Sequence, residues 1–157
     1  MTITILAVGK LREAYYRAGV EDYLKRIKRY LPTEQIEVLP GTGEECNGGG
    51  RGAIAREAAT LGKHLGKDGR VVALDRAGRQ LSTEEFAKWF QECMNSAVPS
   101  VTFVVGGAWG LDAEIVHKAD LALSLSAFTL PHELARLVMV EQIYRALSLW
   151  KGHPYHK

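Results

Sequence analysis

The chain has 157 residues, the length of a single domain, and its 46% hydrophobic and 24% charged residues are typical of a globular protein. Its net charge of +2 and pI of about 8.6 are less basic than those of a strongly electrostatic nucleic-acid-binding domain. The N-terminal apolar run is too short for a signal peptide, and no run reaches the roughly 20 apolar residues of a membrane span. We therefore expect one cytoplasmic domain over residues 1–157, without a membrane partner.

The first half of the chain alternates between strand and helix patterns. Alternating β-branched residues predict a strand over 2–9, and helical spacing predicts a helix over 13–31 that a proline ends. A short strand over 35–40 follows. The many glycines of segment 41–52 predict a loop. A nucleotide-binding P-loop is disfavoured because the segment lacks the GK[ST] ending. A helix is predicted over 53–65.

The second half shows the same alternation. Its strands are apolar, and we predict them over 69–75, 100–107 and 121–128. The helices are predicted from Ser82, which forms a capping box with Glu85, then over 111–119, and from 133 to about 150. Because strands and helices alternate and the later strands are apolar on both faces, the sequence predicts an α/β fold. We expect a mostly parallel sheet with helices on both faces.

Motifs of covalent and metal catalysis are missing from the sequence. The two cysteines, Cys46 and Cys93, lie far apart without CxxC spacing, which predicts free thiols in a reducing cytosol rather than a disulfide or a zinc site. Neither GxSxG nor HExxH occurs. We therefore expect a cofactor-assisted site or a binding site, with no metal.

Three predicted strands end in segments that suit a ligand. Ligands of open parallel sheets bind at the carboxyl ends of the strands. The candidates are 76–78, "VVGGAWG" at 104–110 and "LSAFTLPH" at 125–132. The glycines allow a sharp turn or a close approach of backbone amides to a ligand. The last segment offers apolar walls and backbone hydrogen bonds, which suit an adenine-like ring; alternatively, Ser126 and Thr129 cap their own backbone.

A basic segment, "YLKRIKRY", lies in the predicted helix over 13–31. Lys25 and Arg29 share one face of that helix at i,i+4 spacing, and Arg26 lies beside them. Two interpretations remain open. The segment is either a solvated helix face or a patch that contacts phosphates.

Several motifs together resemble a known family. They are "ILAVGK", "YLKRI", "VALD", "VVGGAWG", "LSLSAFTLPHELARLVMVEQIYRA" and "HPYH". In these motifs the chain closely resembles the RlmH family of SPOUT-class methyltransferases, along its whole length. The resemblance implies a C-terminal trefoil knot, S-adenosylmethionine as cofactor and a homodimer. It also implies methylation of N3 of a pseudouridine in 23S ribosomal RNA, with the assembled large subunit or ribosome as the substrate.

The resemblance also implies site residues. The positions that match the family's cofactor site are Leu74, Gly106, Gly107, Leu125, Ser126, Ala127, Phe128, Thr129 and Leu130. In the family, the C-terminal tail of one protomer completes the partner's site. Here that tail is His153, Pro154, Tyr155, His156 and Lys157. Two features depart from the family pattern: segment 41–52 is richer in glycine, and Trp109 stands within the glycine turn, where it either stacks on a base or only packs.

Methyl transfer to an imide nitrogen requires loss of a proton and stabilisation of the developing charge. The candidate catalytic residues are His132, Glu141, Arg145, Tyr155 and His156. For RNA binding they are Lys25, Arg26, Arg29, His153 and Lys157. Simpler interpretations remain open for some of them. His132 is alternatively a structural histidine, and Glu141 and Arg145, at i,i+4 spacing, are alternatively an intrahelical ion pair.

Three other functions remain open from the sequence. One is a SPOUT enzyme that acts on ribose or on another base. Another is a catalytically silent RNA- or ribosome-binding module, against which the intact cofactor loop argues. The last is a nucleotide-binding regulator that uses "GGAWG" at 106–110.

Overall fold

The computed structural model describes residues 1–41, 50–66 and 68–153. The strands are β1 (Thr2–Val8), β2 (Thr33–Val38), β3 (Arg70–Gln80), β4 (Ser100–Val105) and β5 (Leu121–Ser124). They form one sheet in the order β2-β1-β4-β3-β5, and each neighbouring pair is parallel. The predicted α/β fold with a parallel sheet is therefore confirmed. The trefoil knot stays a prediction.

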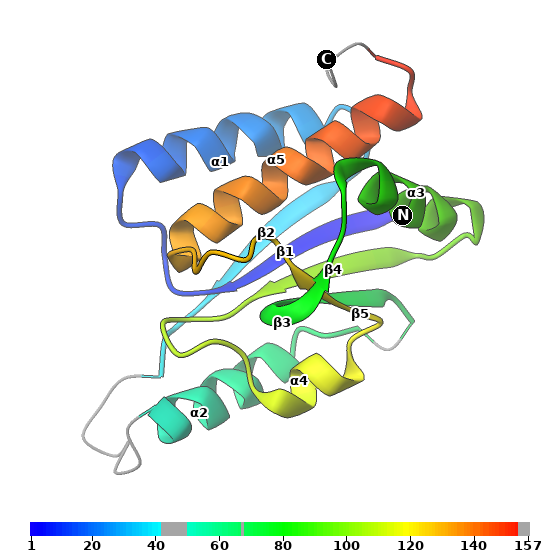
Figure 1. The fold of residues 1–157 in the computed structure, drawn as a ribbon. Helices are drawn as coiled ribbons and strands as arrows, with labels where there is room; N and C mark the ends of the chain where they lie inside the picture. The colour runs from blue at the N-terminus through cyan, green and yellow to red at the C-terminus, as the bar shows by residue number, and fades with distance from the viewer. Residues whose placement is uncertain (42–49, 67, 154–157) are drawn as a thin grey trace.

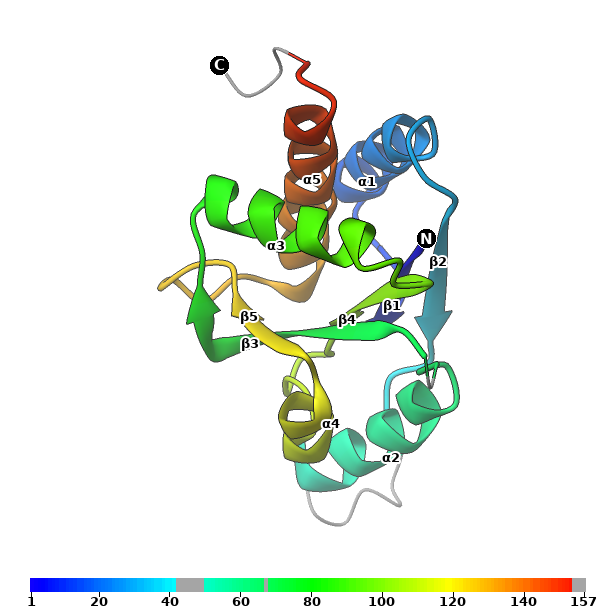
Figure 2. The same ribbon diagram turned by 90° about the vertical axis from the view of Figure 1, so that its right-hand side faces the viewer.

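The helices cover both faces of the sheet, as the sequence predicts. They are α1 (Ala14–Ile27), α2 (Gly50–Gly62), α3 (Thr83–Asn95), α4 (Ala113–Lys118) and α5 (His132–Trp150). On one face lie α1, α3 and α5, with α1 and α5 side by side, and on the other lie α2 and α4 (Figures 1 and 2). Within the described residues no helix is both long and apolar enough to cross a membrane.

Two hydrophobic clusters fill the space between the sheet and the helices. The larger one lies under α1, α3 and α5 and includes Phe90, Phe103 and Ile143. The smaller one lies under α2 and α4 and includes Leu6 and Leu61. Since successive side chains of a strand point to opposite faces, a sheet covered on both sides needs strands that are apolar throughout. This explains the continuous apolar runs in the sequence.

The third strand differs from its prediction. It continues to Gln80 instead of ending at 75, so the expected loop at 76–78 is wrong. The pairing with β5 shifts register between Leu74 and Arg79, which indicates a bulge. A Cβ atom at Gly78 would lie 2.7 Å from the carbonyl carbon of Ala122, so the close approach to β5 requires glycine there. The bulge leaves residues 75–76 at the edge of the sheet where ligands bind.

The ends of several other elements differ from their predicted positions by a few residues. The strand predicted over 121–128 ends at Ser124, which frees residues 125–131 as a loop before α5. The helix predicted over 13–31 ends at Ile27, and α2 begins at Gly50, inside the predicted glycine-rich loop, of which 42–49 lie outside the described residues.

Two local predictions were specific enough to check. The capping box is confirmed: Ser82 Oγ accepts a hydrogen bond from Glu85 N at 3.2 Å, and Glu85 Oε2 accepts one from Ser82 N at 2.7 Å. Cys93 is a buried free thiol, and burial raises its pKa above the usual value. Cys46 lies outside the described residues.

Candidate functional site

A cavity of about 530 Å³ lies at the carboxyl ends of β3, β4 and β5. Its size falls within the usual range for small-molecule sites. The wall residues that sequence analysis assigned to a cofactor are Leu74, Gly106, Gly107, Leu125, Ser126, Phe128, Thr129 and Leu130. Ala127, the ninth, is exposed and is not among the lining residues. The structure thus brings three distant segments of the chain together around one cavity.

The glycine turn after β4 forms one wall. A Cβ atom at Gly106 would lie 2.6 Å from the carbonyl carbon of Gly110, so the turn folds back on itself as only glycine allows. Gly107 and Gly110 form a bridge, with Gly110 N donating to Gly107 O at 3.1 Å, and Gly110 has φ of +83°. Trp109 lies close to Gly50 at the start of α2, yet it is 65% exposed.

Behind this turn lies a buried carboxylate that sequence analysis did not single out. A Cβ atom at Gly107 would lie 3.1 Å from both carboxylate oxygens of Glu57, a residue of α2. Glu57 Oε1 accepts a hydrogen bond from Gly41 N at 3.0 Å, while Oε2 is buried without a partner in the described structure. Glu57 therefore ties α2 to Gly41, just after β2, and lies close behind Gly107.

The loop over 125–131 forms the opposite wall. Ser124 Oγ donates to Ser126 O at 3.1 Å, and Ser126 Oγ accepts from Phe128 N at 2.9 Å. Ser126 thus caps its own backbone, as the simpler of the two interpretations predicts, and it lines the cavity as well. Phe128 is 84% exposed although it lines the cavity. An exposed aromatic ring at the mouth of a cavity suits contact with a further molecule.

Three further polar side chains line the cavity. His132, the first residue of α5, is half-buried and faces it from the helix side. Asp75 and Arg76 line it from β3. The carboxylate Oδ1 of Asp75 accepts a hydrogen bond from Ala77 N at 2.8 Å. Sequence analysis included Arg76 in the candidate segment 76–78 but did not name Asp75 as a site residue; its position at the end of an apolar run is the signal that would have found it.

Glu141 and Arg145 do not line the cavity. Arg145 donates to Glu141 Oε1 through Nε at 3.0 Å and through a terminal nitrogen at 2.6 Å, and Gln142 donates to Glu141 Oε2 at 2.7 Å. The intrahelical ion pair is therefore confirmed. Since a helix rises about 1.5 Å per residue, Glu141 lies about 13 Å along α5 from His132.

The predicted RNA-binding cations also lie away from the cavity. Lys25 and Arg26 are in the last turn of α1, about 17 Å along that helix from its start at the carboxyl edge of the sheet, and Arg29 lies in the turn that follows it. Arg26 forms an ion pair with Asp22 at 2.8 Å and lies over the Tyr23 ring. Within one protomer, these cations and the cavity are at opposite ends of the helical layer.

The C-terminal tail begins at this same far end (Figure 1). His153 Nδ1 lies 2.7 Å from the Tyr30 hydroxyl oxygen. The predicted tail residues Tyr155, His156 and Lys157, with Pro154, lie outside the described residues. The predicted catalytic and RNA-binding residues are therefore spread along α5: His132 is at the cavity, Glu141 is at the middle of the helix, Arg145 is in its second half, and His153 follows its end.

No group of three or more His, Cys, Asp or Glu side chains that could hold a metal ion occurs within residues 1–41, 50–66 and 68–153. The cavity walls instead offer apolar side chains, backbone polar groups, hydroxyl groups and the side chains of Asp75, Arg76 and His132. Such walls can bind an adenosine-like molecule and position an electrophile carried by it, without a protein nucleophile.

Comparison with known proteins identifies relatives over the whole chain. The model of a family described as "Predicted SPOUT methyltransferase" matches residues 1–156. The chain is 39% identical to "Ribosomal RNA large subunit methyltransferase H" of Leuconostoc citreum, with 100% of both chains covered. It is 40% identical to the protein of that name from Acetivibrio thermocellus, again with 100% of both covered, and 39% identical to that from Geobacter metallireducens, with 99% of both covered.

Solved structures show a similar fold at low sequence identity. A probable methyltransferase from Bordetella pertussis Tohama I has a TM-score of 0.56 at 15% identity, over 93% of this chain and 95% of that chain. A probable methylase family protein from Haemophilus influenzae Rd KW20 has a TM-score of 0.53 at 15% identity, over 99% of this chain and 70% of that chain. These two likenesses concern the fold alone.

Proposed function

Because this chain belongs to the SPOUT methyltransferase family, we propose that it transfers a methyl group from S-adenosylmethionine to ribosomal RNA of the large subunit. The acceptor we propose is N3 of a pseudouridine in 23S ribosomal RNA. One observation carries the proposal: eight of the nine residues assigned to a cofactor surround one cavity at the carboxyl edge of the sheet. The relatives named as ribosomal RNA methyltransferases match this chain from end to end, which supports the same substrate class.

The residues around the cavity fit S-adenosylmethionine. Leu74, Leu125 and Leu130 provide apolar walls for an adenine ring, and backbone groups of the loop over 125–131 can bind its edge. Asp75 provides a carboxylate for hydroxyl or ammonium groups. When bound, the cofactor supplies an electrophilic methyl carbon on a sulfonium for in-line displacement.

His132 is the proposed proton acceptor. It lines the cavity at the start of α5, and the acceptor base has to lie beside the bound cofactor. A histidine can take up the imide proton near neutral pH as the nitrogen–carbon bond forms. Arg76 lines the same cavity and can stabilise the negative charge that develops on the base's oxygens. Both roles require a fixed position beside the acceptor base, and positioning of the reacting groups is a main contribution of the protein to a methyl transfer.

We further propose a homodimer in which the tail of one protomer completes the cavity of the other. The separation of the candidate residues within one chain supports this arrangement. His132 lies at the start of α5, whereas Glu141 lies at its middle, Arg145 in its second half and His153 just beyond its end. A second copy related by two-fold symmetry can bring the end of its α5 to this cavity. Tyr155 and His156 would then come from that second copy.

Methyl transfer to ribosomes tests the proposed function. Ribosomes that lack the N3 methyl group, with and without prior pseudouridylation of the target, would be incubated with the protein and labelled S-adenosylmethionine. We expect label in 23S ribosomal RNA of pseudouridylated ribosomes and little in the others, because the proposed acceptor is N3 of pseudouridine rather than of uridine. The modified position would be mapped by mass spectrometry of digested RNA.

Two other outcomes would change the proposal. Label at a ribose, or on ribosomes irrespective of pseudouridine, would contradict the proposed acceptor and favour a related SPOUT activity. Free 23S ribosomal RNA is the control for assembly. Equal labelling of free RNA and of assembled ribosomes would contradict the assembled particle as the substrate, which the modest charge of the chain favours.

A further inference from the structure

Segment 9–13, which joins β1 to α1, is held by a buried arginine of α5. Arg136 is 0% exposed, and one terminal nitrogen donates to Gly9 O at 2.8 Å and to Val8 O at 3.4 Å. The other terminal nitrogen donates to Glu37 Oε1 on β2 at 2.6 Å. Burial lowers the pKa of Arg136, and Glu37 opposes this shift. A guanidinium is costly to bury, so these contacts fix the end of β1 against α5.

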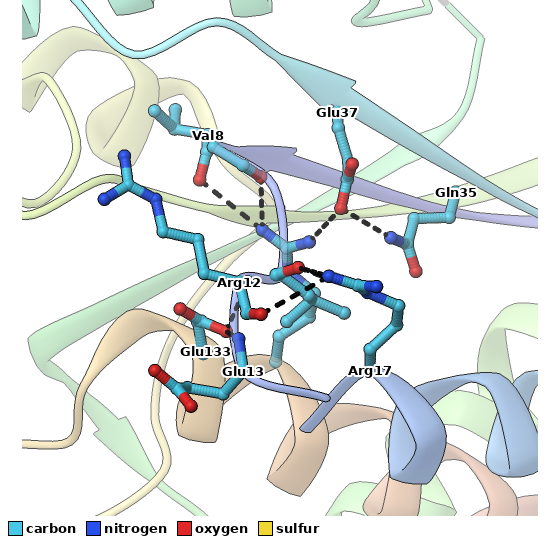
Figure 3. Close-up of polar contacts among 10 residues, drawn as sticks. Val8, Arg12, Glu13, Arg17, Gln35, Glu37 and Glu133 are labelled. Atoms are coloured by element: carbon cyan, nitrogen blue, oxygen red, sulfur yellow. Dashed lines mark hydrogen bonds and ion pairs between the residues drawn. The ribbon is translucent and has the colours of Figure 1, made fainter. Parts of the chain in front are cut away.

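The other end of the segment is held by a buried carboxylate one turn earlier on α5. Glu133 Oε2 accepts hydrogen bonds from Arg12 N at 2.9 Å and Glu13 N at 3.2 Å (Figure 3). Arg17 of α1 donates to Leu11 O at 2.8 Å, between these two anchor points. Arg136 of α5 thus binds backbone carbonyl groups at the start of this segment, and Glu133 of the same helix binds backbone amide groups at its end. Charged groups that are hydrogen-bonded in this way form strong contacts, so the segment is preorganised.

Two cationic side chains project from this fixed segment. Lys10 and Arg12 are exposed, and neither side chain has a hydrogen-bond or ion-pair partner among the described residues. Arg12 is bound through its backbone to Glu133, which directly follows the cavity residue His132. Arg12 therefore lies on the α5 side of the cavity, which Arg76 lines from β3. Lys10, two residues earlier, lines a separate pocket with Glu21 and Glu37. By contrast, Lys25 and Arg29 lie at the far end of α1.

We propose that segment 9–13 is a phosphate-binding element for the ribosomal RNA, in which Lys10 and Arg12 contact backbone phosphates beside the target nucleotide. Glu133 and Arg136 are positioning residues that hold this element at the start of α5. The inference rests on the proposed function. It adds the site at which the RNA backbone contacts the protein. Charge complementarity supports RNA as the occupant, because unpaired cations on a fixed backbone bind phosphates with little loss of conformational entropy.

The first test replaces both cations. We expect the variant Lys10→Gln with Arg12→Gln to raise KM for ribosomes by roughly tenfold, with kcat at saturation within about twofold, because phosphate contacts supply affinity rather than chemistry. The slope of log KM against log salt concentration should fall by roughly one for each lost contact. The affinity for S-adenosylmethionine should not change. Both side chains are exposed, so the variant is expected to fold.

The matched control removes two cations elsewhere. Lys63 follows α2 and Lys88 lies on α3; both are exposed without partners in the described structure. Lys63→Gln with Lys88→Gln should keep the wild-type KM and salt slope. A wild-type KM and salt slope in the Lys10–Arg12 variant would overturn the proposal. Loss of S-adenosylmethionine binding or of all methyl transfer in the unmodified protein would instead count against the proposed function.

The positioning role has a separate signature. Glu133→Ala keeps both cations but removes the acceptor for two backbone amides. We expect KM for ribosomes to rise several-fold with the salt slope unchanged, since the same number of phosphates can still be bound. Glu133→Gln, which retains a side-chain oxygen as acceptor, should restore most of the affinity. An unchanged KM in Glu133→Ala, or a salt slope that falls with it, would contradict the positioning role.

Discussion

Replacing Gly106 with alanine is expected to weaken cofactor binding, and with it methyl transfer, by distorting the cofactor cavity while the chain stays folded. The new Cβ atom would lie 2.6 Å from the carbonyl carbon and 2.7 Å from the carbonyl oxygen of Gly110. Both are backbone atoms, so the turn itself has to move. Steric strain of this kind costs about 1–3 kcal/mol, which corresponds to roughly a tenfold to hundredfold loss of S-adenosylmethionine affinity if it falls on the bound turn. Calorimetric titration would measure it.

Gly62→Ala is the matched control for this substitution. Gly62 ends α2, and a Cβ atom there would meet nothing within 4 Å. Alanine also has a higher helix propensity than glycine, so stability should be equal or slightly higher and cofactor affinity unchanged. Circular dichroism would check that both variants fold. Wild-type affinity in the Gly106→Ala variant would mean that the glycine turn is not a wall of the cofactor site.

Co-expression of two inactive chains is expected to restore methyl transfer, because the proposed homodimer builds each site from both protomers. One chain would carry His132→Ala, and the other would carry Tyr155→Ala. In a mixed dimer, the intact His132 cavity of the second chain receives the intact tail of the first. Random assortment gives half mixed dimers with one complete site each, so we expect about a quarter of the wild-type activity.

The same experiment separates the two arrangements of the tail. If the tail instead acted on the cavity of its own chain, both sites of the mixed dimer would remain defective and no activity would return. Each variant expressed alone provides the baseline. Differently tagged chains, purified in two affinity steps, would isolate the mixed dimer and allow its activity to be measured directly.

Local patterns in the sequence predicted most of the elements, because each depends on near neighbours. The capping box of Ser82 and Glu85 involves residues three apart, and the apolar runs of β1 and β4 reflect a sheet covered on both faces. The residues assigned to the cofactor gather at one cavity, because the carboxyl ends of parallel strands meet at one edge. Periodicity was sufficient for the elements and strand direction for the edge where a ligand binds, whereas the individual cofactor residues came from the family resemblance.

Features that depend on distant partners could not be predicted in this way. The extension of β3 to Gln80 requires β5 beside it, and the bulge depends on the close approach of Gly78 to Ala122. Arg136 looked like one more charged residue in an apolar helix, yet its partners come from β1 and β2, about 100 or more residues earlier. The positions of the predicted RNA-binding cations depend on the direction of α1. Lys25 lies in its last turn and Arg29 just beyond its end, so both are far from the cavity.

Equilibrium titration of the protein with S-adenosylmethionine, NAD and ATP tests the central claim most directly. If the cavity at the ends of β3, β4 and β5 is the site of a methyltransferase, S-adenosylmethionine should bind more tightly than either nucleotide. The Gly106→Ala variant should bind S-adenosylmethionine roughly tenfold to hundredfold more weakly. Failure of the unmodified protein to bind S-adenosylmethionine would contradict the claim and support a silent RNA-binding module, whereas tighter binding of NAD or ATP would indicate a nucleotide-binding regulator.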